Sequence, residues 1–121
     1  MLPPFEYESP GRKPPSEVRI RDLHVELWPD GRRVRVHLEL TPFEQKPSVD
    51  LTITTSGGDP VAATSIVENM VFKLVITMHL RGVEDPAGSY QVHATVYYPD
   101  QEPVDQATAA FSVPGAASPE G

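Results

Sequence analysis

An apolar–polar alternation on both sides of an Asp30-Gly31 pair constrains the fold of this chain more than any other feature. A period of two is that of a strand with one buried face, and Asp-Gly favours a two-residue type I′ hairpin turn. The apolar positions are Leu23, Val25 and Leu27 before the pair and Val34, Val36, Leu38 and Leu40 after it. If Asp30 and Gly31 form the turn, each pair of inward-facing residues on the two strands is apolar. The turn and the apolar–polar alternation therefore predict the same strand register. Val18 and Ile20 are out of phase with Leu23, which predicts a bulge or a strand switch near Asp22.

The same period recurs downstream, where turn sequences rich in Gly, Pro and Asp separate the apolar runs. Strands are expected over 48–55, 61–67, 71–80, 89–98 and 106–113. Their inward residues are Val49, Leu51, Ile53, Phe72, Leu74, Ile76, Met78, Leu80, Tyr90, Val92, Ala94, Val96, Tyr98, Phe111 and Val113. The segment 61–68 has apolar residues on both faces and is either an edge strand or a short helical turn. The chain has seven short strand-like segments and no stretch whose apolar residues recur at helical spacing. This pattern predicts an all-β, antiparallel sandwich of two sheets.

The length of 121 residues suits one domain. Five of the first 17 residues are proline, so we expect residues 1–17 to form a flexible arm, with Phe5 and Tyr7 as anchors if it docks. The sandwich is expected over 18–113 and a disordered tail over 114–121, where small residues predominate.

The amino-acid composition limits which partners and which chemistry the chain can have. Ten Lys and Arg against 17 Asp and Glu give a net charge of −7, which disfavours nucleic acids and anionic membranes as partners. The absence of cysteine excludes disulfides, thiolate nucleophiles and Cys-ligated metals. The N-terminus does not resemble a signal peptide, and no apolar run is long enough to cross a membrane, so we expect a cytoplasmic protein.

The segment from Asp85 to Ala94 (DPAGSYQVHA) resembles the corner before strand F of immunoglobulin-like sandwiches, where an acidic residue, a glycine and a tyrosine follow in that order. The resemblance covers residues 18–113 and assigns Tyr90 the corner role, in which its hydroxyl bonds to the chain a few residues upstream. Val92 stands where antibody-type domains have cysteine, which points to cysteine-free bacterial immunoglobulin-like or fibronectin type III-like domains. The implied fold is a seven-stranded immunoglobulin-like sandwich.

The polar face of the hairpin carries the first candidate site. His24 should lie opposite His37, and the immunoglobulin topology places the second strand beside the fifth, which carries His79. Three imidazoles in reach of one another would make a metal or pH-sensing site; the simpler interpretation is three separate exposed side chains, and we expect no bound metal. On the same face Glu26 should pair with Arg35, and Trp28 should contact Arg33 or anchor a partner.

The opposite sheet should present a weakly charged outer face around Tyr97. Its candidate interaction residues are Thr52, Thr54, His93, Thr95 and Tyr97. Such a face could pack against a second copy or a partner domain. The alternative is an ordinary sheet surface, because threonine suits strands regardless of contact.

The sequence contains no catalytic motif, since nucleophile elbows, phosphate-binding loops and HExxH helices are all missing. We therefore expect a non-enzymatic protein without a cofactor, acting as an immunoglobulin-like protein-interaction module that binds a protein partner or itself. One alternative is a protease inhibitor that presents the loop from Pro42 to Pro47, with an aromatic residue and a lysine between prolines. Another is an adhesin-like or carbohydrate-binding domain, which would require export.

Overall fold

The computed structural model describes residues 11–82 and 86–114. A short 3-10 helix, η1 (Pro15–Glu17), precedes seven strands, and the five strands after the hairpin match the expected segments to within two residues at each end. The strands are β1 (Ile20–Leu27), β2 (Arg33–Leu40), β3 (Ser48–Thr55), β4 (Pro60–Ile66), β5 (Lys73–His79), β6 (Gly88–Tyr97) and β7 (Asp105–Val113). No helix within these described ranges has the length and hydropathy needed to cross a bilayer.

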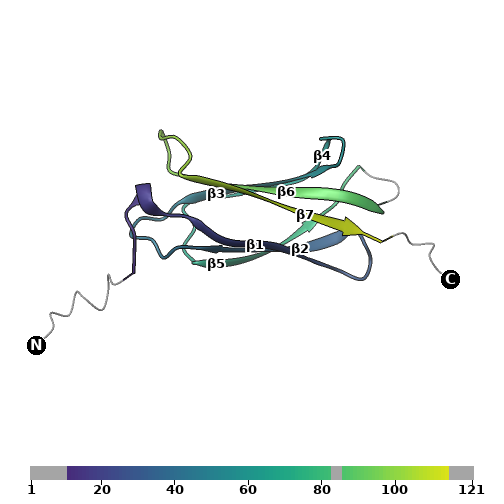
Figure 1. Ribbon diagram of the computed structural model, residues 1–121, viewed down its shortest axis with the longest axis horizontal. Helices are drawn as coiled ribbons and strands as arrows, with labels where there is room; N and C mark the ends of the chain where they lie inside the picture. Colours follow the sequence, from purple (N-terminus) through teal and green to yellow (C-terminus); the bar gives the residue numbers. More distant parts are fainter. Residues whose placement is uncertain (1–10, 83–85, 115–121) are drawn as a thin grey trace, which may run out of the picture.

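The strands form two antiparallel sheets that face each other, which confirms the predicted sandwich (Figure 1). One sheet has the order β1-β2-β5, so the second strand does lie beside the fifth. The other has the order β4-β3-β6-β7. The uncertain segment after residue 60 is therefore an edge strand. It pairs with β3, whereas constant-type immunoglobulin domains place the fourth strand beside the fifth.

The β1–β2 register is the predicted one. Leu27 pairs with Val34 and His24 with His37, and a register shift between Ile20 and Asp22 confirms the bulge. The predicted type I′ turn is wrong, because that turn needs a positive φ at both central residues and only Gly31, at 70°, has one.

The turn is instead closed by Gly31 N–H donating to Trp28 O at 3.1 Å, and Trp28 N–H donates to Arg33 O at 3.0 Å. Pro29 takes the second position of this turn, where its restricted φ is favourable. The loop therefore runs from Pro29 to Arg32 and keeps the same strand register as a two-residue turn centred on Asp30 and Gly31.

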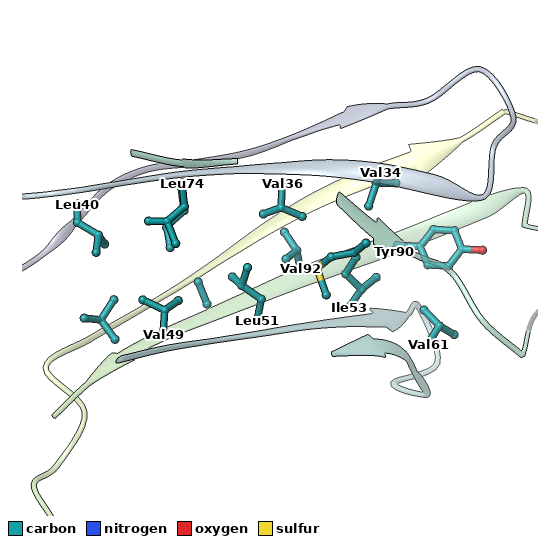
Figure 2. Packing of buried hydrophobic residues seen from close by; sticks show 14 of the residues in the cluster. Val34, Val36, Leu40, Val49, Leu51, Ile53, Val61, Leu74, Tyr90 and Val92 are labelled. Atoms are coloured by element: carbon teal, nitrogen blue, oxygen red, sulfur yellow. The ribbon is translucent and has the colours of Figure 1, made fainter. Parts of the chain in front are cut away.

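The core lies between the sheets. Figure 2 shows Val34, Val36 and Leu74 on one side facing Val49, Leu51 and Ile53 on the other. These side chains are almost completely buried, as the alternation predicts. Towards the β1 edge burial is weaker, and Leu27 remains 37% exposed. Two buried polar residues, Ser48 and Asn69, were not anticipated. Both support the chain between β4 and β5: Asn69 N–H donates to Pro47 O at 2.7 Å, and Glu68 N–H to Ser48 Oγ at 3.2 Å.

The Tyr90 corner is present. Tyr90 is 3% exposed, and its hydroxyl donates to Pro86 O at 2.6 Å, four residues upstream. Its ring stacks on Phe111 of β7, with centroids 5.3 Å apart. The hydroxyl thus holds the connection that enters β6 from the other sheet, as the resemblance implies.

The last part of the arm expected over residues 1–17 is bonded to the sandwich. Lys13 N–H donates to Pro42 O at 2.9 Å, and Glu44 N–H donates to Lys13 O at 3.0 Å. The Arg12 guanidinium also lies 5.7 Å from the centre of the Phe72 ring. A composition argument counts apolar side chains and misses these main-chain bonds, which a single residue between prolines can still make. The suggested anchors Phe5 and Tyr7, and residues 115–121 of the expected tail, lie outside the described residues.

Candidate functional site

The outer face of the β1-β2-β5 sheet, called here the charged face, consists of four rows of three side chains. Strand register aligns one residue from each strand in three rows, and the bond from Trp28 N–H to Arg33 O places Trp28 in the fourth, just beyond the end of β1. From the hairpin end the rows are Trp28–Arg33–His79, Glu26–Arg35–Thr77, His24–His37–Val75 and Asp22–Glu39–Lys73. Arginine and tryptophan therefore lie at the hairpin end, and carboxylates at the other end with Lys73.

His24 and His37 form a stacked pair in the third row. Their ring centroids are 4.4 Å apart with 7° between the planes. Each ring also meets a carboxylate: His24 Nδ1 lies 2.6 Å from Asp22 Oδ2, and His37 Nε2 lies 3.0 Å from Glu26 Oε1. The hydrogen bond from His37 is the main reason why the pKa of Glu26 is lowered. The roles of Asp22 and Glu26 were missed, although the alternation places both on this face.

The third candidate histidine is not part of this pair. His79 lies opposite Arg33 at the hairpin end, two rows from His37, which faces Val75. In the part of the chain that the structure describes, no three His, Asp or Glu side chains are arranged to hold a metal ion. The pair is therefore a two-histidine cluster with a carboxylate at each end.

Trp28 lies under two guanidinium groups. The Cζ atoms of Arg33 and Arg35 are 4.2 Å and 5.3 Å from the ring centroid. Arg33 Nε donates to Asp30 Oδ2 at 2.8 Å, and Arg35 lies 3.7 Å from Glu26. Both contacts expected from the register, Trp28 with Arg33 and Glu26 with Arg35, are present.

Asp30 organises the turn beside this cluster. Its carboxylate accepts the backbone N–H groups of Arg32 at 2.9 Å and Arg33 at 3.1 Å. The bond from the Arg32 N–H and the contact with the Arg33 side chain lower the pKa of Asp30 to about 2. The turn is thus tied to an ionised carboxylate at neutral pH.

The outer face of the β4-β3-β6-β7 sheet, called here the Thr-rich face, holds the predicted interaction residues together. Register places Thr52 beside His93 and Thr95 beside Asp50, while Thr54 and Tyr97 continue the same face. The full set is Ser48, Asp50, Thr52, Thr54, Ala63, Ser65, Ser89, Gln91, His93, Thr95, Tyr97, Gln106, Thr108, Ala110 and Ser112. Within this set Asp50 is the one carboxylate, and there is no Lys or Arg. Trp28, the sixth predicted interaction residue, belongs to the other sheet.

Hydrogen bonds order the polar groups of the Thr-rich face. Asp50 Oδ1 accepts the Ser65 hydroxyl at 2.6 Å and the Tyr97 hydroxyl at 3.3 Å. Partial burial raises the pKa of Tyr97, and the adjacent Asp50 charge raises it further. His93 lies between two threonines, with Nε2 3.0 Å from Thr54 Oγ1 and Nδ1 3.3 Å from Thr108 Oγ1. The face is therefore largely neutral, and these six polar side chains are bonded to one another within the sheet.

The loop between Pro42 and Pro47 is folded onto the body of the sandwich. Phe43 is 5% exposed and packs edge-on against Phe72, with centroids 4.8 Å apart. The Tyr98 hydroxyl donates to Gln45 O at 2.8 Å and holds the middle of the loop. The aromatic side chain that the inhibitor alternative would present is thus a core residue, and Glu44, Gln45 and Lys46 form the exposed part of the loop.

The observed class is a seven-stranded antiparallel β-sandwich with an ordered neutral face and an opposite charged face. No protein-family model matches this chain, and no curated protein is significantly similar to it.

Among solved structures, the sandwich is similar to parts of glycoside hydrolases. A Parabacteroides merdae β-glucuronidase has a TM-score of 0.56 at 18% identity, over 79% of this chain and 13% of that one. A Lactobacillus rhamnosus β-glucuronidase has a TM-score of 0.53 at 15% identity, over 80% and 16%. A glycosyl hydrolase family 2 member from Bacteroides cellulosilyticus has a TM-score of 0.56 at 12% identity, over 79% and 15%. The shared feature is the fold, and the chain spans about a sixth or less of these enzymes.

Proposed function

We propose that this chain is a non-catalytic, immunoglobulin-like module that binds a folded protein domain through its Thr-rich face. The observation that carries the proposal is the distribution of charge between the two outer faces. In a chain with a net charge of −7, a four-stranded sheet surface carries one carboxylate, which accepts two hydrogen bonds from Ser65 and Tyr97. The other sheet carries charged groups in three of its four rows.

A neutral face loses its hydration at lower cost than a charged one, because burying an ionised group without a partner is the most expensive part of forming an interface. Thr54 and Thr108 are already bonded to His93, so these three side chains lose little freedom on binding. Tyr97 adds a large amphipathic ring of the kind enriched at binding hot spots. Together these features favour packing against another protein surface.

The similar solved structures support a folded domain as the partner. In the β-glucuronidase chains the matched part is 13–16% of the polypeptide, so a sandwich of this fold occurs there as one part of a much longer chain. We propose the same position for the present sandwich, as a module of a larger glycosidase-like assembly. The competing occupant of this face is a second copy of the chain.

Substitution of Tyr97 tests this proposal. Tyr97→Glu puts a second carboxylate beside Asp50 and should abolish binding, while the matched control Thr77→Glu puts the same charge on the other sheet. Tagged wild-type and variant chains are used to capture partners from the native host, followed by mass spectrometry. A partner retained by wild type and Thr77→Glu but lost by Tyr97→Glu supports the proposal. A partner that Tyr97→Glu retains fully contradicts it.

Analytical ultracentrifugation distinguishes the two possible occupants, a partner domain and a second copy of the chain. A wild-type dimer that Tyr97→Glu converts to monomer, with Thr77→Glu still dimeric, identifies a second copy as the occupant. Dimerisation that persists in Tyr97→Glu assigns the contact to another surface, such as an exposed strand edge, where main-chain groups would make the interface.

The alternative functions each have a separate test and less structural support. An inhibitor would project the side chain that inserts into the protease, but Phe43 is buried; a panel of purified proteases tests this reading. A carbohydrate-binding domain would stack sugar rings on an exposed aromatic face, but the Arg33 guanidinium already covers one face of Trp28. A glycan array tests that reading.

A further inference from the structure

Strand β5 is an open edge of the β1-β2-β5 sheet. Among the residues that the structure describes, β2 is its one strand neighbour. At the two ends of β5, Phe72 O accepts Leu40 N–H and Leu80 N–H donates to Arg32 O, both at 2.8 Å, so the even-numbered residues bond to β2. Successive residues of a strand direct their main-chain groups to opposite sides, so the odd-numbered residues direct their N–H and C=O groups to the open side. These residues are Lys73, Val75, Thr77 and His79.

The other edge strands carry protection that β5 lacks. β1 lies beside β7, and Ile20 N–H of β1 donates to Asp105 Oδ2 of β7 at 2.8 Å. β4 begins with Pro60, and its register with β3 shifts between Ile53 and Thr54. Covering elements, prolines and bulges are common means of keeping an edge strand from pairing with another chain. β5 contains no proline and keeps a regular register with β2 over its whole length, so it is the edge best suited to accept another strand.

Exposed apolar side chains gather at this edge. Val75 is 54% exposed in the middle of β5. Val67, Met70 and Val71, which are 71%, 72% and 49% exposed, lie in the connection from the edge strand β4 to β5. In the part of the chain that the structure describes, five large apolar residues are exposed, and four of them are these. Such a concentration of apolar surface at one place marks a site of interaction.

The β5 edge is complementary to a second copy of itself. At its far end Arg81 N–H donates to Val61 O of β4 at 2.9 Å, so the accessible stretch runs from Lys73 to Thr77 with Val75 at its centre. Antiparallel pairing about a two-fold axis at Val75 puts the two Val75 residues opposite each other and Lys73 opposite Thr77. No like charges face each other in this register. Residues 69–82 also contain no carboxylate, although the net charge of the chain is −7, so acidic groups on this segment do not oppose the approach of a second copy.

We propose that two copies of this chain pair their β5 strands and form one continuous six-stranded sheet. At the two-fold axis each Val75 N–H donates to the Val75 carbonyl of the other copy, and a Lys73–Thr77 pair extends the ladder on either side. The exposed Val75 side chains pack against each other as a cross-strand pair. In the same register Val71 lies opposite His79 of the second copy, so the exposed residues before β5 enlarge the contact. A strand pair this short falls below the ~1,000 Å² of a stable interface without them, and we expect a weak, reversible dimer.

The β5 edge is separate from the Thr-rich face, because the two belong to different sheets. A dimer formed through β5 leaves the Thr-rich face of both copies accessible, so it would present two such faces to partner domains. Tyr97→Glu should not alter this dimer, since Tyr97 lies on β6. The two proposals therefore fail separately.

The test combines analytical ultracentrifugation with amide hydrogen exchange of the full ¹⁵N-labelled chain. The chain should dimerise with a dissociation constant below ~1 mM. Exchange of the odd-numbered amides at 73, 75 and 77 should slow at least ~2-fold between dilute protein and ~1 mM protein, because half or more of the chains are then paired. The even-numbered amides at 74, 76 and 78 bond to β2 at every concentration and are the internal control. A monomer at ~1 mM, or a dimer in which the odd-numbered amides stay unprotected, would overturn the proposal.

Two substitutions at Val75 give the matched comparison. Val75→Pro removes the N–H group at the two-fold axis but no bond to β2, and an edge strand tolerates proline where the N–H faces away from the sheet. Val75→Thr keeps the N–H group and the branched shape. Val75→Pro should raise the dissociation constant of the dimer at least ~10-fold and Val75→Thr less than ~3-fold. Equal effects of the two variants would show that main-chain pairing does not hold the dimer and would refute the proposal. If the NMR spectrum of Val75→Pro shows an unfolded chain, the exchange pattern of the wild type still decides the question.

Discussion

Removing one hydroxyl group, in Tyr90→Phe, measures how much the corner before β6 contributes to stability. The hydroxyl donates to Pro86 O at 2.6 Å from a side chain that is 3% exposed. The variant keeps the ring and its stacking on Phe111, so the loss is that of the hydroxyl and its bonding. A buried acceptor left without its donor costs ~1–3 kcal/mol. Because Pro86 is only half-buried, water can reach its carbonyl in part, which places the expected loss at ~1–2 kcal/mol.

Urea denaturation followed by Trp28 fluorescence gives the free energy of unfolding, and calorimetry should show a melting temperature lower by ~5–15 °C. Tyr97→Phe is the matched control, since its hydroxyl makes a longer bond, 3.3 Å to Asp50, on a solvent-facing sheet. The control should change the free energy by less than ~0.5 kcal/mol. Equal effects of the two variants, or a Tyr90→Phe chain as stable as wild type, would refute the assigned role of the corner.

Three further changes test other parts of the structure. The pKa of Asp30 is lowered to about 2, so its ionised form stabilises the fold above about pH 4, and this contribution is lost as the pH falls towards 2; Asp30→Asn should flatten the acid limb of melting temperature against pH, and an unchanged limb would contradict the assignment. Phe43→Ala should cost ~3–5 kcal/mol in urea denaturation, because the ring is buried against Phe72; a loss below ~1 kcal/mol would mean that the loop is not part of the core. Deleting residues 1–16 removes the Lys13 bonds to the β2–β3 loop and should lower the melting temperature in calorimetry, whereas an unaltered value would restore the flexible-arm interpretation.

Local features of the chain were predictable from the sequence. The β1–β2 register follows from alternation on both sides of a short connection, because a shift by one residue would turn every apolar side chain to solvent. The Tyr90 corner follows from a short stretch of sequence, because the carbonyl that accepts the Tyr90 hydroxyl belongs to Pro86, four residues upstream. The neutral composition of the Thr-rich face also follows from alternation, since β3 and β6 each present every second residue.

Other features depend on contacts between segments far apart in the sequence. The sequence left open whether His79 lies within reach of the histidine pair, and the β2–β5 register places it opposite Arg33, two rows from His37. No short turn connects these two strands, so packing of the whole sheet decides their alignment. The turn at Asp30 was assigned to the wrong type because it was centred on Asp30 and Gly31, whereas the bond from Gly31 N–H to Trp28 O makes Pro29 and Asp30 its central residues.

Burial outside the strands was likewise decided by tertiary structure. Phe43 looks like an exposed loop residue in a linear reading, and becomes a core residue because Phe72 and the docked residues 12–13 meet it from distant parts of the chain. The sequence by itself determined the strands, the faces they present and the hairpin register, because each depends on neighbours within a few residues. Only the tertiary structure decided which side chains of β5 share a row with those of the hairpin, and thus that the histidine pair stands apart from His79, because this alignment arises from packing between segments that no local pattern connects.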